Sequence, residues 1–274
     1  MSYTPPTAIL RAVPLALPRC ELTWIARDPL DLDLARAQHR GYAAALEQAG
    51  LHVVMLPPEN DLPDSCFVED LVIDLGEVRV LTRPGAPSRE PEREAMKRAF
   101  APGGPLEAYG PLLEMPQGLR LDGGDVLMVR DRLFVGLSSR TDIDAVQWLA
   151  AQTSLRAAGV HVCGALHLKT AVSALTENAL IVNPEAVDLA PFLFFDLLKV
   201  PPGEECGVNV LRLPPRLDEV GPDARDERVL MDQRCVKSIA IARRWGVEVI
   251  PVDISEFAKA EAGLTCLSVL LSGG

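Results

Sequence analysis

The sequence predicts an α/β fold in which five units of about fifty residues form a closed ring. Two observations predict this fold. First, a pattern of two short apolar runs, an amphipathic segment and another apolar run recurs along the chain, with proline or glycine between the parts. Second, the last unit has only one strand of its hairpin, and the apolar run at 7–12 can supply the other. We therefore expect a five-bladed ββαβ propeller, closed by the N-terminal strand, in a single domain spanning 1–274.

Each predicted element has a local reason. The segment 31–48 carries apolar residues at helical spacing and stops at Gly50, and the strand 53–56 stops at Pro57. The charged stretch 214–227 reads as a surface insertion within a hairpin. In chain order the predicted elements are the strand 7–12, helix 31–48 and strand 53–56; the hairpin 71–74 and 78–82, helix 92–100 and a strand before Pro116; the hairpin 125–129 and 133–135, helix 142–156 and strand 160–163; the hairpin 171–175 and 179–182, helix 185–195 and strand 197–200; and the hairpin 208–213 and 228–231, helix 234–245, strand 247–252 and last strand 266–271.

Composition limits the functions open to this chain. Its 274 residues carry a formal net charge of -11, which repels nucleic-acid phosphates and favours a small cationic ligand. The start of the chain lacks a signal-peptide pattern, and no apolar run is long enough to span a bilayer. The six cysteines form no C-x-x-C spacing, and cysteine and histidine do not cluster at metal-ligand spacing. We expect reduced thiols in a cytoplasmic protein, with no metal, cofactor, nucleic-acid or membrane partner.

A ring brings equivalent loops together near its axis, and these loops carry the residues whose side chains can take part in catalysis. Cys266 lies in the last apolar run, where core filling is one interpretation and nucleophilic catalysis is another. His167, between two leucines, is either a core residue or the acid and base that serves Cys266. Asp122 precedes Gly123 and Gly124, which permit a tight backbone with positive φ, and it can orient the histidine or close a turn.

The loop 63–70 and two arginines predict what such a site would bind. Asp64, Glu69 and Asp70 place three carboxylates within seven positions, and Phe67 lies between them. Carboxylates near a core need a positive partner, and a planar guanidinium suits them because it offers five donors to carboxylates and a face to an aromatic ring. A solvated acidic loop is the alternative. Arg89 and Arg140 both follow hairpins and precede helices, where they can clamp a carboxylate or remain surface residues.

These residues resemble the dimethylarginine dimethylaminohydrolases of the guanidine-modifying (pentein) superfamily. Six motifs carry the resemblance, in the order of the family and over nearly the whole chain: Pro63–Asp70, Thr82–Arg89, Leu121–Val126, Phe134–Thr141, Leu166–Lys169 and Leu264–Ser268. The resemblance implies a fold of five ββαβ blades, in agreement with the repeat. The stretch 13–28 matches poorly, and the insertion 214–227 departs from the family pattern.

The resemblance implies a role for each matching residue. Cys266 is implied as the nucleophile, His167 as the general acid and base, and Asp122 as the carboxylate that orients the histidine. The residues implied to bind substrate are Asp64, Phe67, Glu69 and Asp70 at the guanidinium, Arg89 and Arg140 at the amino-acid carboxylate, and Leu22 in a lid.

The implied activity is hydrolysis of Nω-methylated L-arginines to L-citrulline and an alkylamine through a covalent cysteine intermediate, without a cofactor. Three alternatives stay open: an arginine deiminase-like or other guanidine hydrolase of the same superfamily, a catalytically silent protein that binds methylarginines, and, as the weakest, a metal hydrolase. The expected partner is a small guanidino amino acid, and a homodimer is left open.

Overall fold

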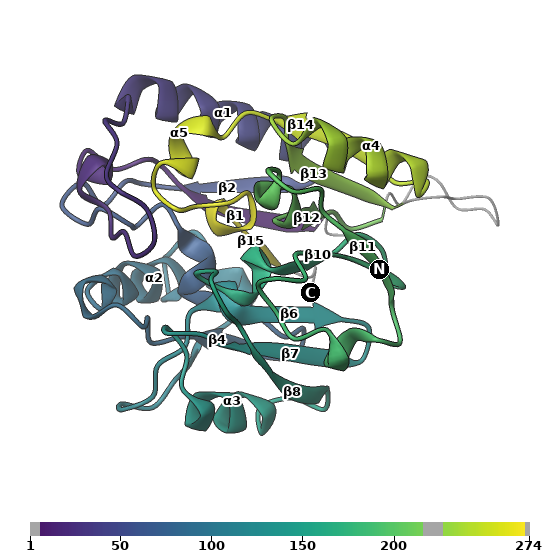
Figure 1. The fold of residues 1–274 in the computed structure, drawn as a ribbon. Helices are drawn as coiled ribbons and strands as arrows, with labels where there is room; N and C mark the ends of the chain where they lie inside the picture. Colours follow the sequence, from purple (N-terminus) through teal and green to yellow (C-terminus); the bar gives the residue numbers. More distant parts are fainter. Residues whose placement is uncertain (1–5, 216–226, 272–274) are drawn as a thin grey trace.

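Five three-stranded sheets form the framework of the protein in the computed structural model, which describes residues 6–215 and 227–271. In each sheet the middle strand pairs antiparallel with one neighbour and parallel with the other. The blades are β15 (Val269–Leu271), β1 (Thr7–Arg11), α1 (Leu32–Gln48) and β2 (His52–Leu56); β3 (Val72–Asp74), β4 (Arg79–Leu81), α2 (Glu92–Phe100) and β5 (Leu113–Glu114); β6 (Val126–Val129), β7 (Arg132–Leu137), α3 (Ile143–Ala150) and β8 (Arg156–His161); β9 (Val172–Ala174), β10 (Ala179–Val182) and β11 (Asp196–Lys199); and β12 (Leu211–Arg212), β13 (Arg228–Asp232), α4 (Val236–Arg244) and β14 (Glu248–Val252). The predicted five-bladed α/β propeller is confirmed (Figure 1).

The N-terminal strand closes the ring, as the sequence predicts. β1 pairs antiparallel with β15, so that Thr7 lies opposite Leu271 and Ile9 opposite Val269, and it pairs parallel with β2. Figure 1 shows β1 between strands from both ends of the chain. The two chain ends therefore hold each other in one sheet.

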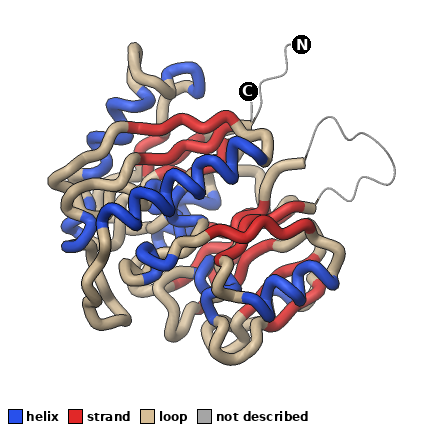
Figure 2. The backbone as a smooth tube through the Cα atoms, turned by 90° about the horizontal axis from the view of Figure 1, so that it is seen from above, coloured by secondary structure: helices blue, strands red, loops and turns tan. Residues whose placement is uncertain are grey.

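The hydrophobic core is divided among the interfaces between blades. Each of five buried clusters joins the residues of two neighbouring blades. In β1, Ile9 packs in the cluster shared with the second blade, whereas Ala8 and Leu10 pack in the cluster shared with the fifth. Because side chains alternate along a strand, the middle strand of each sheet is buried on both faces. Figure 2 shows the strands in separate short groups with helices over them.

The longest helix, α1, forms where local signals agree. Asp31 caps it by accepting the backbone N–H groups of Asp33 and Leu34 at 3.0 Å. Gly50 follows its end with φ 92°, a conformation that favours glycine. Tyr42 and Leu46 are buried on its inner face, and this amphipathic spacing made the helix predictable.

The predicted helix 185–195 is wrong. The segment contains a 3₁₀ turn, η7 (Ala190–Phe192), and Val187 forms an isolated β-bridge with Val162. Pro191 lies inside the segment, lacks an N–H group, and would clash with the carbonyl four residues earlier in an α-helix. Apolar composition alone therefore misled the prediction for the fourth blade.

Two other boundaries differ from the predictions. α3 ends at Ala150 instead of reaching 156, because residues from Arg156 pair with β7 as β8. The short helix α5 (Ser255–Ala258) lies in the segment 253–265 that we expected to be a loop. Of the predicted insertion 214–227, residues 216–226 lie outside the described part of the chain.

One 3₁₀ turn precedes the first strand of every blade, and these turns bring the site together. Each turn ends the loop that leads into its blade, and each contacts the turn of at least one neighbouring blade. They are η2 (Val68–Asp70), η5 (Gly123–Asp125), η6 (Leu168–Thr170), η8 (Glu205–Val208) and η9 (Thr265–Leu267).

Candidate active site

A closed ring of hydrogen bonds joins the five turns. The Gly124 N–H donates to Asp70 at 3.1 Å, and the Leu168 N–H donates to Asp125 at 2.8 Å. Asn209, which follows η8, donates to the Lys169 carbonyl at 3.1 Å and accepts the Thr265 N–H at 3.0 Å. The Thr265 hydroxyl then donates to Glu69 at 2.7 Å. Every blade thus holds the loop of its neighbour, and the predicted loops do converge.

His167 is oriented by Asp122, as the sequence predicts. Its Nε2 lies 2.9 Å from Asp122 Oδ2, and both side chains are buried. The other carboxylate oxygen of Asp122 accepts the Gly85 N–H at 2.7 Å. Asp122 is fixed from both sides, so the imidazole cannot rotate without losing a buried bond.

The charges around His167 favour the imidazolium form. Burial alone would lower its pKa, but the carboxylates of Asp70, Asp122 and Asp125 outweigh burial and raise the pKa from 6.5 to about 9. Its Nδ1 has no hydrogen-bond partner among the described residues and lies 4.0 Å from Asp70 Oδ1. A buried imidazolium with one unpaired N–H has a proton that it can donate.

Gly123 and Gly124 are needed for close approach rather than for positive φ. Neither has a positive φ, so that expectation was wrong. A Cβ on Gly124 would lie 2.5 Å from His167 Nδ1, and a Cβ on Gly123 would lie 1.9 Å from the Glu69 carbonyl oxygen. The histidine ring can therefore pack against Gly124, and the Glu69 carbonyl against Gly123, only because these two residues have no side chain.

Cys266 lies in the turn η9, three residues before the strand in which we predicted it. Tyr42 of α1 holds this turn, since its hydroxyl bonds the Leu264 carbonyl at 2.9 Å and the Ser268 hydroxyl at 2.7 Å. The Gly263 N–H donates to Cys266 Sγ at 3.4 Å. Burial and the carboxylates of Glu69 and Asp70 raise the pKa of the thiol, which favours its protonated form.

The acidic loop supplies the negative charge around Cys266. Asp64, Glu69 and Asp70 are all buried, which excludes the solvated-loop alternative. Burial raises the pKa of Asp64 and Glu69, and Glu69 is bound to Lys169 Nζ at 2.5 Å. His167 and Arg89 outweigh the effect of burial on Asp70 and lower its pKa.

Phe67 is buried among apolar side chains of the site wall. Its ring meets Phe257 edge to face, with centroids 6.4 Å apart, and it belongs to the same core cluster as Cys266. The thiol of Cys66 beside it is fully buried, which raises its pKa and makes it a poor nucleophile.

The two arginines have different partners in this structure. Arg89 is buried, and its guanidinium binds Asp70 at 2.5 Å, Glu92 at 2.9 Å and the carbonyls of Asp64 and Phe67. Arg140 is half-buried and donates to the Thr23 hydroxyl at 2.8 Å. Arg89 therefore fixes Asp70 in this structure, and its role at a substrate carboxylate stays a prediction.

The segment 20–27 covers the site and is held by carboxylates. The Glu21 N–H contacts Asp64 at 3.2 Å. Glu261 accepts the consecutive N–H groups of Thr23, Trp24 and Ile25, with 2.8 Å to Thr23 and 2.7 Å to Ile25. Leu22 is half-buried against the cluster that contains Cys266. Its role as a lid residue stays a prediction.

Sequence reasoning missed Asp125, Lys169, Asn209 and Thr265. Asp125 is fully buried and accepts the hydroxyls of Ser138 and Thr141, both at 2.6 Å. Its place beside Gly124 could have marked it. Asn209 carried no signal in the sequence, because its partners lie 40 and 56 residues away along the chain.

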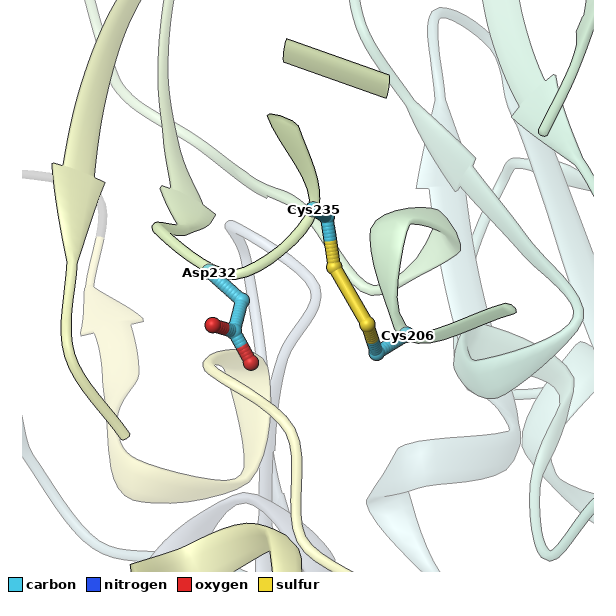
Figure 3. Close-up of side chains that lie close together, drawn as sticks. All are labelled: Cys206, Asp232 and Cys235. Carbon is cyan, nitrogen blue, oxygen red and sulfur yellow. A yellow bond between two sulfur atoms is a disulfide. The ribbon is translucent and has the colours of Figure 1, made fainter. Parts of the chain in front are cut away.

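Among the residues that the structure describes, two groups of side chains have metal-ligand geometry, although the sequence predicted none. Asp70, Asp122 and His167 form one group, with their ligand atoms within 4.8 Å of one another, and Cys206, Asp232 and Cys235 form the other. In the first group, Asp122 bonds His167 and the Gly85 N–H, and Asp70 bonds Arg89, as described above. In the second, the sulfurs form a disulfide, and the Asp232 carboxylate lies beside it (Figure 3). The expectation that all cysteines are reduced is therefore wrong for this pair.

A pocket of about 300 Å³ opens beside the site on the same face. It lies between Trp24 of the covering segment, Leu166 before His167, and Gly263 and Leu264 before Cys266.

Within residues 6–215 and 227–271, no helix combines the length and hydropathy needed to cross a membrane.

Five three-stranded blades that bring together a cysteine, a histidine and carboxylates have the pentein fold, and the relatives of this chain show that it is a hydrolase acting on guanidino C–N bonds. The sequence profile described as "N,N dimethylarginine dimethylhydrolase, eukaryotic" matches residues 29–190. The N(G),N(G)-dimethylarginine dimethylaminohydrolase of Streptomyces coelicolor is 36% identical over 253 residues, 91% of each chain. That of Pseudomonas aeruginosa is 31% identical over 247 residues, 86% of this chain and 89% of the relative. The chain belongs to the dimethylarginine dimethylaminohydrolase family.

Solved structures agree with this assignment. A cysteine-to-serine variant of the Pseudomonas aeruginosa enzyme complexed with citrulline superposes with a TM-score of 0.83 at 27% identity and covers 98% of this chain and 100% of that one. A histidine-to-glycine variant of a dimethylarginine dimethylaminohydrolase, as an adduct with S-methyl-L-thiocitrulline, gives 0.85 at 28% identity, over 97% and 100%. The N-terminal domain of ArgZ, an arginine dihydrolase from Cyanobacteria, shares the fold at a TM-score of 0.81 and 18% identity, with 97% of each chain covered.

Proposed function

We propose that this protein hydrolyses Nω-methylated L-arginines to L-citrulline and dimethylamine or methylamine, with the whole chain acting as one catalytic unit. Cys266 is the nucleophile, His167 the general acid and base, and Asp122 the group that orients His167. Asp64 and Asp70 hold the guanidinium, with Glu69 and Phe67 beside them. Arg140, Arg89 and Leu22 contribute at the amino-acid end.

One observation carries the proposal: a buried imidazolium, a buried protonated thiol and three buried carboxylates lie on or beside turns that one ring of hydrogen bonds joins. His167 has a pKa of about 9, and the pKa of Cys266 is raised by burial, Glu69 and Asp70. A cationic guanidinium between Asp70 and Cys266 would neutralise the charge that holds the thiol protonated. The bound substrate would thus let the thiol release its proton to solvent and become the thiolate, and an empty site would stay unreactive.

The reaction divides into two steps. The Cys266 thiolate attacks the guanidinium carbon, and Nδ1–H of His167 protonates the alkylamine as the C–N bond breaks. A cationic S-alkylthiouronium remains on Cys266. Neutral His167 then takes a proton from water, which attacks the same carbon, and the C–S bond breaks to give citrulline and the thiol.

Two alternatives differ in substrate or in turnover. Plain arginine would release ammonia by the same steps. The fold that this chain shares with ArgZ, described as an arginine dihydrolase, is the reason to test arginine as a substrate. A silent methylarginine-binding protein would not require the unpaired Nδ1 of His167. Incubation with asymmetric dimethylarginine, monomethylarginine and arginine side by side, with citrulline and amine measured, separates the three.

The assignment of Cys266 has a direct test. Cys266→Ser should abolish citrulline formation while it leaves the fold and substrate binding in place, and Cys163→Ser, at an exposed free cysteine, should remain active. Turnover by Cys266→Ser at the unmodified rate would disprove the proposal. Mass spectrometry of the quenched reaction should detect the adduct on the peptide that contains Cys266.

A further inference from the structure

Of the five turns in the ring, η8 is the one that neither contains nor adjoins a residue of the proposed mechanism. Each of the other turns contains or adjoins a residue of the proposed mechanism. η8 contains Cys206 and ends at Asn209, and Cys206 forms a disulfide with Cys235, the N-cap of α4. By its place in the ring, this disulfide is connected to the site.

The connection is a short chain of buried hydrogen bonds. The Asn209 N–H donates to the Cys206 carbonyl at 3.3 Å, and the Asn209 side chain binds the N–H and the hydroxyl of Thr265 and the carbonyl of Lys169. Thr265 directly precedes Cys266, and Lys169 follows His167 by two residues. Asn209 therefore joins the turns of the nucleophile and of the acid to the turn that Cys206 fixes.

One residue of the pair is exposed and the other is buried. Cys206 is exposed and lines the 300 Å³ pocket, with Asp232 and Arg234 in the same wall, whereas Cys235 is fully buried. The Asp232 carboxylate is bound by the Arg234 guanidinium at 2.5 Å, which offsets its repulsion of an incoming thiolate. A small thiol that enters the pocket therefore meets Cys206 first.

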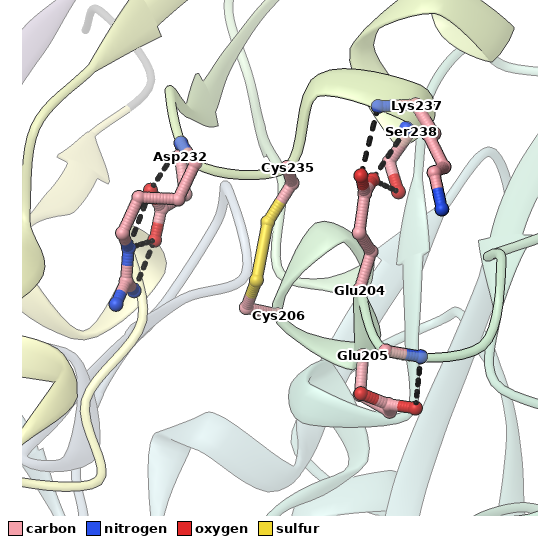
Figure 4. The surroundings of a disulfide bond; sticks show 9 residues. Glu204, Glu205, Cys206, Asp232, Cys235, Lys237 and Ser238 are labelled. Atoms are coloured by element: carbon pink, nitrogen blue, oxygen red, sulfur yellow. Dashed lines mark hydrogen bonds and ion pairs between the residues drawn. A yellow bond between two sulfur atoms is a disulfide. The ribbon is translucent and has the colours of Figure 1, made fainter.

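The two cysteines stay adjacent even without their bond. Glu204, before η8, accepts the N–H groups of Lys237 at 3.0 Å and Ser238 at 2.8 Å, and so caps α4 from the turn. Gly207 packs directly on Ser238, since a Cβ there would lie 2.3 Å from the hydroxyl oxygen. Figure 4 shows Glu204 and Asp232 on opposite sides of the disulfide. Reduction would thus loosen the turn without releasing it, and the bond can form again.

We propose that Cys206 and Cys235 are a reversible thiol–disulfide exchange site for a small-molecule thiol such as glutathione, and that its oxidised state holds Cys266 in its working position. In reduction, one thiolate attacks Cys206 Sγ and displaces the Cys235 thiolate, which takes a proton. A second thiol then displaces Cys206 from the mixed disulfide, which leaves two protein thiols and one molecule of the small disulfide. Oxidation reverses both steps. The effect on activity rests on the proposed function, whereas the exchange itself does not.

The test measures the redox state and the activity separately. The full-length protein is equilibrated in buffers of reduced and oxidised glutathione, quenched with an alkylating reagent, and digested, so that the peptides linked through Cys206 and Cys235 can be quantified. Citrulline formation from asymmetric dimethylarginine is measured on the same samples. We expect the linked fraction to rise with oxidised glutathione, and kcat to be about tenfold higher in the linked form, because small displacements of a catalytic group cost large factors in rate.

Two variants keep the result open to refutation. Cys206→Ser should show the lower kcat in every buffer, whereas Cys163→Ser, which changes an exposed unpaired cysteine, should respond as the unmodified protein does. Cys235→Ser repeats the first result if one variant folds poorly. Failure to form linked peptides in any buffer overturns the exchange site. An equal redox response in Cys206→Ser overturns the coupling, and absence of citrulline with intact exchange refutes only the proposed function.

Discussion

Replacement of Asp122 by asparagine tests how the site keeps His167 protonated. Asp122 Oδ2 lies 2.9 Å from Nε2, and its other oxygen accepts the Gly85 N–H. The asparagine oxygen can keep the bond to Gly85, and its NH₂ group then faces Nε2. The change thus removes a negative charge and an acceptor while it keeps the shape of the side chain.

The magnitude follows from the pKa of His167, which is about 9. The loss of one adjacent charge should lower this pKa toward about 7, within the range that single partners produce. At pH 8 the protonated fraction would fall from about nine-tenths to about one-tenth, so kcat should fall roughly tenfold, with little loss at pH 6.

Stability should change over the same pH range. The folded-state pKa of His167 lies above its ordinary 6.5, so protonation favours the folded protein. That contribution, about 3 kcal/mol, is fully present below pH 6.5 and is lost as the pH rises through about 9. Asp122→Asn should lose part of it, so its unfolding free energy should fall most below pH 6.5 and converge on that of the unmodified protein above pH 9.

NMR titration of the histidine ring protons is the assay, since the chain has four histidines and His167→Gly identifies the signal of interest. The alkaline limb of the kcat profile should move with the NMR pKa. Asp131→Asn, which changes an exposed carboxylate paired with Arg156, is the matched control and should leave both unchanged. An unaltered His167 pKa in Asp122→Asn would refute the electrostatic reasoning.

Three further changes probe the supports of the site. Asn209→Asp keeps an acceptor for the Thr265 N–H but loses both donated bonds, so kcat should fall about tenfold while KM stays nearly constant; a change confined to KM would contradict this. Glu261→Gln weakens the charge-assisted bonds to the covering segment, so KM should rise about fivefold in steady-state assays with kcat nearly unchanged, and an unaltered KM would show that this contact does not hold the segment. Gly124→Ala places a Cβ 2.5 Å from His167 Nδ1, so kcat should fall about hundredfold with a much smaller change in melting temperature; near-normal turnover would mean that His167 can shift freely.

The sequence determined the architecture because its signals are local. Apolar runs between prolines and glycines marked the short strands, and α1 and α2 were predicted within one residue of their bounds. The unpaired last strand predicted closure by β1, and pairing of Thr7 with Leu271 confirms it. The helix 185–195 failed because its apolar composition was given more weight than Pro191, which prevents a continuous helix.

The candidate residues were also predictable, because Asp64, Asp122, His167 and Cys266 stand in short motifs within loops that a ring brings together. Only the tertiary structure decided how they are held. The ring of hydrogen bonds through Asp125, Asn209 and Thr265 joins residues 40 to 196 positions apart, and no local pattern specifies such contacts.

The tertiary structure also decided the protonation states and the state of two cysteines. The pKa values of His167 and Cys266 depend on burial and on carboxylates from other blades, which a sequence does not place at a distance. Cys206 and Cys235 are 29 residues apart and lie in different elements, so composition indicated reduced thiols, while the packing of η8 on α4 brought them together. The sequence therefore determined which residues face the axis, and the fold determined their charges and their connections.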